Sequence, residues 1–421
     1  MIGDIRIKLS DLIMTFSRVL DFVNQKVSNH HLRVAVIASA IARESGMISQ
    51  DLNDVFLASA IHDIGAFSTK EKFDALEFEM INPHVHTERG YLLVRHNKHF
   101  LNIANIIRYH HLAWSEGEGR QFNGEDVPPG AHILHLADRI EVLINRNQEV
   151  LDQRDAIRES ILSRSGSTFM PELVEIFESL SLRESFWFDA ASPEISRRIL
   201  DTNAIPGVEL NIEGLTHISR LFSNIIDYRS PFTAVHSSGV SAVATTLAQM
   251  TGFSEIELDM VRIAGYLHDV GKLAVPLEIL DKPGRLTTGE FNIIKSHVYH
   301  SYRILEGVPG LETINMWGSL HHERIDGTGY PFHLKGSELP MVSRIMAVAD
   351  VFTAITEDRP YRKGMNGKEA LRVIEDMAGN NALDHSIVGI ASAYFKHLND
   401  VRIEAQEKAR EGYLSVKLFA E

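Results

Sequence analysis

The sequence contains no cysteine among its 421 residues. Disulfide bonds and thiolate zinc sites are therefore excluded, and the 21 histidines are the nitrogen ligands that remain for a metal. The 42 Lys and Arg are outnumbered by 56 Asp and Glu, which gives a formal net charge of -14. This balance argues against a broad cationic face that would bind a nucleic-acid polymer or an anionic membrane.

Long apolar runs are also missing. No uninterrupted apolar segment approaches the ~18 residues that span a bilayer, and residues 1–8 lack the basic-then-apolar layout of a signal peptide. We therefore expect a cytoplasmic protein without a membrane partner, and the lack of cysteine is consistent with that compartment.

Strand-type alternation is nearly absent, whereas apolar residues recur at helical spacing along almost the whole chain. The sequence therefore predicts an all-α fold. An opening helix or two is expected within residues 1–28, and further helices of the first half are expected at 32–42, 52–61, 90–94, 103–109 and 133–144.

The histidines and aspartates form a series that occurs twice. Each series has a lone His, a His-Asp pair, a third His, a His-His pair and a final Asp. The lone His and the His-Asp pair are 32 residues apart in both halves, and the third His and the His-His pair are 24 apart in both. We interpret the two series as a duplicated domain. The first series is His30, His62, Asp63, His86, His110, His111 and Asp138; the second is His236, His268, Asp269, His297, His321, His322 and Asp350.

The length also suits two domains of roughly 200 residues. We predict one helical domain at 1–184 and another at 215–421. Between them, residues 185–214 are expected to form a partly helical linker, because Ser192-Pro193 and residues 205–207 interrupt the apolar periodicity.

The second series has the chemistry of a metal site. Asp350 lies in the apolar stretch 344–352, where an unpaired carboxylate would be costly to desolvate. Five histidines and two aspartates exceed what one tetrahedral ion requires and suit two ions that share a carboxylate. Asp269 is predicted to be that bridge. Lys272, one helical turn after His268, is predicted to neutralise charge that develops on a phosphorane.

Four stretches of the second half carry a family pattern: 268–272 (His-Asp-Val-Gly-Lys), 280–287, 321–331 with its Gly-Tyr-Pro ending, and 349–363. With them, residues 231–363 resemble the HD-GYP family. This family is a branch of the HD metal-dependent phosphohydrolases that hydrolyses bacterial cyclic dinucleotides.

The resemblance implies two tandem HD-type domains and the following roles. The seven residues of the second series would be metal ligands for two divalent ions, iron or manganese more often than zinc, and Lys272 the catalytic lysine beside Asp269. A metal-bridging hydroxide would open c-di-GMP or 3',3'-cyclic GMP-AMP to the linear dinucleotide, and the sequence does not choose between these substrates. The implied substrate-binding residues are Arg324, Gly329, Tyr330, Pro331, Arg359 and Arg362.

One position departs from the family pattern. Some members hold a third metal through an acidic residue four positions before the first histidine, and that position is Phe232 here. A two-metal site is therefore expected, and hydrolysis beyond the linear dinucleotide is left open.

The first half resembles a divergent HD domain. It keeps all seven residues of the series, but Ala66 replaces the lysine and residues 112–119 replace the Gly-Tyr-Pro turn. Two interpretations stay open: the seven residues form a second metal site, or they are inherited residues that hydrogen bonds now satisfy. In both cases we expect a regulatory or architectural role, which includes a face for a homodimer.

Three further histidines lie near the first series. His31 falls outside the repeat register and is expected at the surface. His132 and His135 are expected to be helix histidines satisfied by hydrogen bonds, with a role as alternative ligands left open.

Two other functions compete with hydrolysis of a cyclic dinucleotide. One is a non-catalytic receptor that binds the nucleotide and signals through a protein partner. The other is a general phosphohydrolase of nucleoside monophosphates or alarmones. Lys272 and the Gly-Tyr-Pro turn argue against the receptor, and the Gly-Tyr-Pro turn argues against the general phosphohydrolase.

Overall fold

The computed structural model describes residues 5–20, 29–78, 82, 84–192, 195, 208–230, 233–358 and 362–417. These residues form two compact units. The N-terminal unit runs from Leu12 to Val208, and the C-terminal unit runs from Glu209 onward and includes the chain up to Asp11.

The N-terminal unit is built of helices, and the helices predicted at 32–42, 52–61, 90–94, 103–109 and 133–144 are confirmed. Its elements are α1 (Leu9–Leu20), α2 (His30–Glu44), α3 (Ser49–Ala60), α4 (Thr69–Ala75), α5 (His84–Val94), α6 (Leu101–Tyr109), η2 (Ser115–Arg120), β2 (Gln121–Phe122), β3 (Glu125–Asp126), α7 (Pro129–Leu143), α8 (Val150–Leu162), α9 (Pro171–Ser181) and α10 (Glu184–Ala190).

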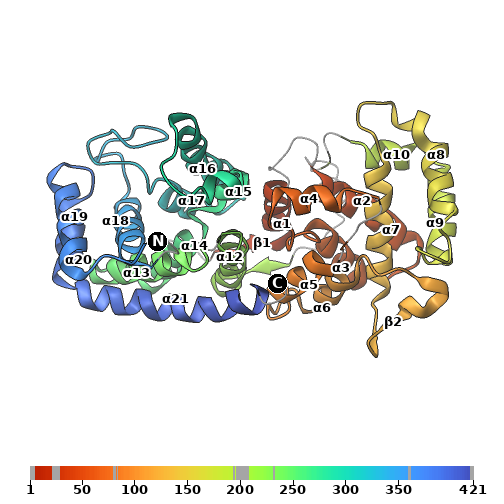
Figure 1. Ribbon diagram of the computed structural model, residues 1–421, viewed down its shortest axis with the longest axis horizontal. Helices are drawn as coiled ribbons and strands as arrows, with labels where there is room; N and C mark the ends of the chain where they lie inside the picture. The colour runs from red at the N-terminus through yellow and green to blue at the C-terminus, as the bar shows by residue number, and fades with distance from the viewer. Residues whose placement is uncertain are drawn as a thin grey trace. The chain divides into compact units, whose positions relative to one another are not determined.

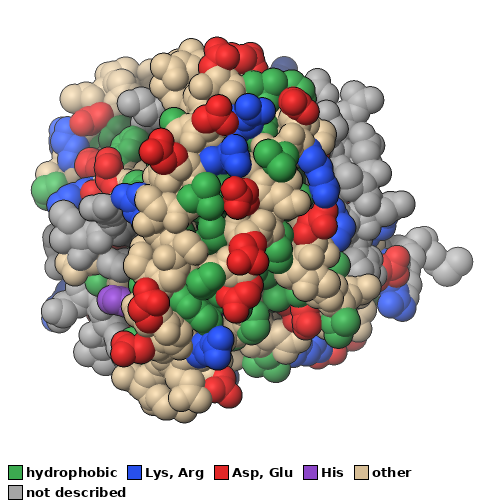
Figure 2. Space-filling model, turned by 90° about the vertical axis from the view of Figure 1, so that its right-hand side faces the viewer, with side chains coloured by type: hydrophobic (Ala, Val, Ile, Leu, Met, Phe, Trp, Pro, Cys, Tyr) green, Lys and Arg blue, Asp and Glu red, His purple; other side chains and the backbone are tan. Residues whose placement is uncertain are grey.

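Helix α2 packs against α3 and α7, and α5 packs against α6 (Figure 1). The strands β2 and β3 form a short antiparallel hairpin in which Gln121 faces Asp126. Helices α8 and α9 lie at the end of the unit that Figure 2 faces, where acidic and basic side chains are interspersed with hydrophobic ones.

The C-terminal unit is also helical, so the all-α prediction is confirmed for both units. Its elements are β1 (Ile7–Lys8), β4 (Glu209–Leu210), α12 (Ile212–Asp227), α13 (His236–Met250), α14 (Glu255–Leu267), η3 (Val270–Ala274), α15 (Leu277–Leu280), α16 (Thr288–Glu306), α17 (Glu312–Ser319), α18 (Met341–Thr356), α19 (Gly367–Gly379), α20 (His385–Ala393) and α21 (Phe395–Lys417).

Helix α13 is the centre of this unit, because it contacts α14, α18 and α21. The long helix α21 runs along the edge of the unit (Figure 1). Strands β1 and β4 pair antiparallel, with Ile7 opposite Leu210. No helix of the described residues is both long and apolar enough to cross a bilayer.

The sequence repeat corresponds to a repeat of helices. α2 and α13 both have 15 residues and begin at the lone histidine. The His-Asp pairs follow the ends of α3 and α14, and the His-His pairs follow the ends of α6 and α17. The third histidines lie in α5 and α16, and the final aspartates lie in α7 and α18. The two series therefore occupy matching places on matching helices.

A glycine two residues after each His-Asp pair allows a close contact of backbones. A Cβ atom on Gly271 would lie 2.0 Å from the carbonyl oxygen of His297, and one on Gly65 would lie 2.0 Å from that of His86. Real Cβ atoms do not approach a backbone oxygen so closely. The missing side chain therefore lets the helix that carries the third histidine approach the His-Asp pair.

We expect Gly271→Ala to destabilise the C-terminal unit by about 1–3 kcal/mol, because the added methyl group must push α16 away from η3. Chemical denaturation of the whole chain measures this effect. Gly389→Ala is the matched control: Gly389 is exposed within α20, and a Cβ there would have no described neighbour within 4 Å. That substitution should stabilise by up to about 1 kcal/mol. Equal losses at both positions would contradict the close-contact argument.

Candidate metal centres

The carboxylate of Asp269 lies at the centre of the second series. Its Oδ2 atom is 3.0 Å from Nε2 of His268, and its Oδ1 atom is 3.1 Å from Nε2 of His297. Nε2 of His321 is 3.9 Å from the same Oδ1 atom. The carboxylate thus faces histidines that arrive from three separate segments of the chain.

The second series forms two groups, which a third group containing this carboxylate joins. In each group the potential ligand atoms lie within 4.8 Å of one another. Nε2 of His236 is 3.1 Å from Oδ1 of Asp350. All seven predicted residues are therefore brought together: His236, His268 and Asp350 form one group, His297, His321 and His322 form another, and His268, Asp269 and His321 form the joining group.

Backbone carbonyls fix the orientation of three rings. The Nδ1 atoms of His268 and His321 each lie 2.8 Å from the carbonyl oxygen three residues earlier, that of Gly265 or Gly318. Nδ1 of His297 makes the same contact at 2.5 Å. A ring that donates from Nδ1 to a carbonyl presents the lone pair of Nε2 to the centre, as in histidines that bind metals.

The atoms that face the centre are buried and unsatisfied. The contacts of Nε2 of His268, His297 and His321 with the Asp269 carboxylate lack hydrogen-bond geometry, so these atoms and Oδ1 of Asp269 have no hydrogen-bond partner among the described residues. A buried polar atom without a partner typically costs about 1–3 kcal/mol. Neutral imidazoles and carboxylates are ligands of Fe and Mn. The residues present therefore fit a metal centre.

Lys272 brings a positive charge into the centre. Its Nζ atom is ion-paired with Oδ2 of Asp269. Burial alone would lower the pKa of Lys272, but the Asp269 carboxylate raises it. Burial likewise opposes ionisation of Asp269, but His268 and Lys272 hold its pKa well below the usual range. Both groups are therefore charged at neutral pH.

A carboxylate that the sequence analysis missed holds the lone histidine. Oε1 of Glu357 is 3.1 Å from Nδ1 of His236, and Oε2 accepts a 3.0 Å hydrogen bond from Nε2 of Gln406. Burial lowers the pKa of His236, but Glu357 and Asp350 raise it to about 10. A metal at this ring must therefore displace a proton. The available signal was spacing, since Glu357 lies two helical turns after Asp350.

We expect Glu357→Gln to weaken metal binding about 10- to 100-fold, because a charged outer partner orients the ring and raises its basicity. Competition with a chelator of known affinity, monitored through Mn²⁺, measures the change. Glu369→Gln serves as the control, since Glu369 caps α19 and glutamine also serves at that position. If the control loses as much affinity as the Glu357 variant, the proposed orientation of His236 is wrong.

The Gly-Tyr-Pro turn lies against the His-His pair. The ring of Tyr330 stacks on that of His322 with centroids 5.0 Å apart and an interplanar angle of 28°. The buried Glu323 anchors the turn, because its carboxylate accepts hydrogen bonds from the backbone N–H groups of Phe332 at 2.7 Å and Leu334 at 3.1 Å. A Cβ on Gly329 would lie 2.4 Å from Cα of Glu323, which explains the glycine.

The two predicted substrate arginines that the structure describes are both exposed. Arg324 is exposed at the turn, and Arg362 is exposed and donates a 2.6 Å hydrogen bond to the carbonyl of Ala354. Arg359 lies outside the described residues. Contact of these residues with a substrate, and that of Gly329, Tyr330 and Pro331, stays a prediction.

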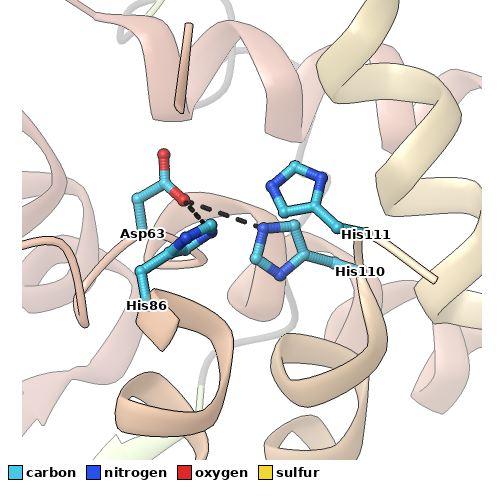
Figure 3. Close-up of side chains that lie close together, drawn as sticks. All are labelled: Asp63, His86, His110 and His111. Carbon is cyan, nitrogen blue, oxygen red and sulfur yellow. Dashed lines mark ion pairs between the residues drawn. The ribbon is translucent and has the colours of Figure 1, made fainter. Parts of the chain in front are cut away.

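The first series adopts a similar arrangement. Asp63 is central here: its Oδ1 atom is 3.3 Å from Nε2 of His86 and 3.7 Å from Nε2 of His110 (Figure 3). Its Oδ2 atom is 3.4 Å from Nε2 of His62. All seven predicted residues are again close together, since Asp63, His86, His110 and His111 form one group, His30, His62 and Asp63 form another, and Asp138 is 3.4 Å from His30.

Hydrogen bonds do not account for the atoms that face this centre. Within the described part of the chain, seven buried atoms lack a hydrogen-bond partner: Nε2 of His30, His62, His86, His110 and His111, and Oδ1 of Asp63 and Asp138. The interpretation that hydrogen bonds now satisfy the inherited residues is therefore disfavoured, and the residues fit a metal here too.

The positive charge is placed differently in the two units. Ala66 is buried at the position of Lys272. Arg139 instead contacts Oδ2 of Asp138 at 2.6 Å, and it donates a 2.8 Å hydrogen bond to the carbonyl of Ala75. The cation of the N-terminal unit is thus tied to the final aspartate and to the backbone.

A carboxylate also orients the lone histidine of the N-terminal unit. Oε2 of Glu141 lies 2.5 Å from Nδ1 of His30, and its other oxygen binds Arg33 at 2.8 Å. Burial lowers the pKa of His30, but Glu141 and Asp138 raise it to about 10. Glu141 is one helical turn after Asp138, whereas Glu357 is two turns after Asp350, so the two carboxylates are not repeat equivalents.

Of the three histidines near the first series, one lies as predicted and two do not. The surface prediction for His31 is wrong: its side chain is buried, with its ring 4.8 Å from that of His62, because α2 is covered on nearly all sides. His132 is satisfied as predicted, through Nε2 and the carbonyl of Gly119 at 3.0 Å. His135 is not, since its Nδ1 atom has no hydrogen-bond partner in the described structure.

Comparisons with known proteins agree with this architecture. A family model described as HD domain matches residues 220–387, and another with the same description matches 27–143. The 3'3'-cGAMP-specific phosphodiesterase 1 of Vibrio cholerae is 31% identical over 396 residues, which cover 91% of this chain and 91% of that protein. The chain belongs to the HD-GYP family. It contains two HD domains in tandem.

Two further relatives of the HD-GYP chain are informative. A cyclic di-GMP phosphodiesterase of Pseudomonas aeruginosa is 35% identical over 212 residues, which cover 50% of each chain. The crystal structure of a cyclic GMP-AMP-specific phosphodiesterase of Vibrio cholerae superimposes with a TM-score of 0.61 at 24% identity, over 93% of this chain and 98% of that one. The superposition supports the shared fold.

Proposed function

We propose that this HD-GYP protein is a metal-dependent phosphodiesterase that opens a bacterial cyclic dinucleotide to the linear dinucleotide. The catalytic domain would be the one predicted at 215–421. The observation that carries the proposal is the clustering of seven potential ligands in groups that the one containing Asp269 joins, with Lys272 paired to that carboxylate and the Gly-Tyr-Pro turn against His322.

The residues of the C-terminal unit have separate tasks in this proposal. Two divalent ions, which we propose to be iron or manganese, would supply Lewis acidity toward phosphodiester oxygens and lower the pKa of a water molecule. Asp269 links the two ligand groups. Lys272, held in place by its ion pair, neutralises negative charge that develops on the phosphoryl oxygens.

Substrate binding is proposed for the surface beside the His-His pair. Tyr330 covers one face of His322 and offers an aromatic wall for a nucleobase. Arg324, Arg359 and Arg362 would supply donors for phosphate oxygens or guanine. The relatives named above act on 3'3'-cGAMP and on cyclic di-GMP, so we propose both compounds as substrates.

Incubation of the purified full chain with each substrate tests the proposal. The protein is loaded with Mn²⁺, or with Fe²⁺ under anaerobic conditions, and the products are separated by chromatography. We expect at least one cyclic dinucleotide to be converted to its linear form. If neither compound is consumed, or if Asp269→Ala consumes them as fast as the parent, the proposal fails.

The same experiment distinguishes the receptor alternative. A receptor would bind the cyclic dinucleotide in equilibrium dialysis and return it unchanged after long incubation with metal. The half-buried charge of Lys272 at the centre favours the enzyme, because binding alone does not require a cation paired with the central carboxylate. The cytoplasmic location and the homodimer remain predictions.

A further inference from the structure

Lys295 is a cation beside the C-terminal centre to which the proposed hydrolysis gives no role. It lies on α16, two residues before His297, and its side chain is partly exposed. Its Nζ atom lies 5.4 Å from the ring centroid of Tyr330, the ring that stacks on His322. The lysine therefore borders the side of the centre where the Gly-Tyr-Pro turn lies.

No carboxylate of the described residues is ion-paired with this lysine. The nearest acidic residue along α16, Glu290, is ion-paired with Lys282 instead. The contacts of the Lys295 ammonium group are with two aromatic rings, that of Phe291 at 4.9 Å and that of Tyr330. Aromatic faces attract a cation but do not neutralise it. In a chain of net charge -14, an ammonium group left in this state beside a metal centre is suited to bind an anionic ligand.

The aromatic surroundings of Lys295 also suit a nucleotide. Phe291 and Tyr299, each four residues from Lys295 on α16, are exposed. Phe332, directly after the Gly-Tyr-Pro turn, is exposed too, and its ring lies 6.4 Å from that of Tyr299. Exposed aromatic faces next to a cation match a ligand that combines planar bases with phosphates.

The N-terminal unit has no ammonium group at the equivalent position. Lys295 and His84 both lie two residues before the third histidine of their series. The ring of His84 stacks on that of Phe122, with centroids 6.5 Å apart. Ala66 likewise replaces Lys272. The repeat therefore has both lysines only in the unit for which hydrolysis is proposed.

We infer that Lys295 binds the second phosphodiester of the cyclic dinucleotide, an inference that rests on the proposed hydrolysis. Lys272 is paired with Asp269 and serves the phosphodiester at the centre. Lys295 contacts the ring of Tyr330 instead. A cyclic dinucleotide holds two phosphodiesters in one ring, so two separate cations suit it. Because Lys295 binds a group that does not react, it should determine KM more than kcat.

Initial rates of the Mn²⁺-loaded full chain over a range of substrate concentrations test the inference. Lys295→Met keeps an unbranched side chain that packs on aromatic rings but removes the charge. We expect its KM for a cyclic dinucleotide to rise about tenfold or more, with kcat within about twofold of the parent. Lys295→Arg keeps the cation and should stay close to the parent. Bis(4-nitrophenyl) phosphate has a single phosphodiester, so Lys295→Met and the parent should hydrolyse it at equal rates.

Lys368→Met is the matched control for the loss of one positive charge, since Lys368 is exposed on α19. Its KM should equal that of the parent. Added NaCl gives a second readout, because salt screens the attraction between an exposed cation and a phosphate. The KM of the parent should rise more steeply with NaCl than the KM of Lys295→Met, whereas a purely structural role for the side chain predicts equal slopes.

Two results would overturn the inference when the parent is active. One is a parent-like KM in Lys295→Met. The other is an equal loss of kcat/KM for the cyclic dinucleotide and for bis(4-nitrophenyl) phosphate, which would place the effect at the metals.

If the parent consumes neither cyclic dinucleotide, the proposed hydrolysis fails and Lys295 is tested by itself. Equilibrium dialysis of the unchanged compounds against the Mn²⁺-loaded chain then measures binding. About tenfold weaker binding in Lys295→Met supports the phosphate site. Equal binding, or no saturable binding to the parent, refutes it.

Discussion

Replacing Asp269 by asparagine will lower the rate of cyclic dinucleotide hydrolysis by more than about 100-fold. Loss of a residue that only orients a metal ligand typically lowers metal affinity or activity by about 10- to 100-fold. The larger effect is expected because Asp269 lies within reach of three histidines and joins both ligand groups. Asparagine keeps the shape but supplies one acceptor oxygen and no charge. Initial rates of linear dinucleotide formation, together with metal content per chain, measure the effect.

The control for this prediction is Asp400→Asn. Asp400 pairs with Lys396 on the exposed face of α21. Its loss removes a carboxylate from the same unit without touching the ligand groups, so activity and metal content should match the parent. A parent-like rate for Asp269→Asn would show that hydrolysis, if present, does not use this centre.

Lys272→Met will lower kcat about 10²- to 10³-fold, which is the usual cost of removing one group that stabilises charge in the transition state. Methionine keeps much of the apolar length of lysine but removes the cation. The pKa of Lys272 is raised by Asp269, so the lysine is charged throughout the neutral range. The expected signature is a fall in kcat with metal content near that of the parent.

Lys408→Met provides the matched control, because Lys408 is ion-paired with Glu404 at an exposed position of α21. Exposed pairs contribute about 0–1 kcal/mol, so stability and kcat should change little. If Lys272→Met loses its metal in proportion to its activity, Lys272 supports the centre instead of the transition state, and the proposed role is wrong.

The arrangement of the candidate centres was largely predictable from the sequence. Each ligand-type residue of the two series begins, follows or lies within a helix of the repeat, so conserved spacing along the chain implies a matching position in space. His236 begins α13 and His268 directly follows α14, and these helices pack together. Apolar residues at helical spacing predicted where the helices lie, because each helix packs apolar side chains into the core of its unit.

The side chains that the sequence analysis missed do not lie at equivalent positions of the two repeats. Glu357 and Glu141 orient equivalent histidines from different turns of their helices, so comparison of the two halves could not align them. Arg139 is adjacent to Asp138 but has Val351 as its repeat equivalent. The surface prediction for His31 was wrong because a position outside the repeated series says nothing about whether a side chain is buried.

The two units differ most in where their positive charge lies. Lys272 is paired with the central carboxylate of its unit, whereas Arg139 is paired with the final aspartate of the other and is also bound to backbone carbonyls. With Ala66 in place of the lysine, the N-terminal centre has no described ammonium group at the position that Lys272 occupies in the C-terminal centre. We therefore propose that hydrolysis takes place in the C-terminal unit alone.

One side-by-side measurement tests this assignment most directly. Asp63→Asn and Asp269→Asn change repeat-equivalent carboxylates, and initial rates of linear dinucleotide formation are compared at saturating metal. We expect Asp63→Asn to keep the rate of the parent and Asp269→Asn to lose it. Loss of activity in Asp63→Asn, with Asp269→Asn still active, would contradict it.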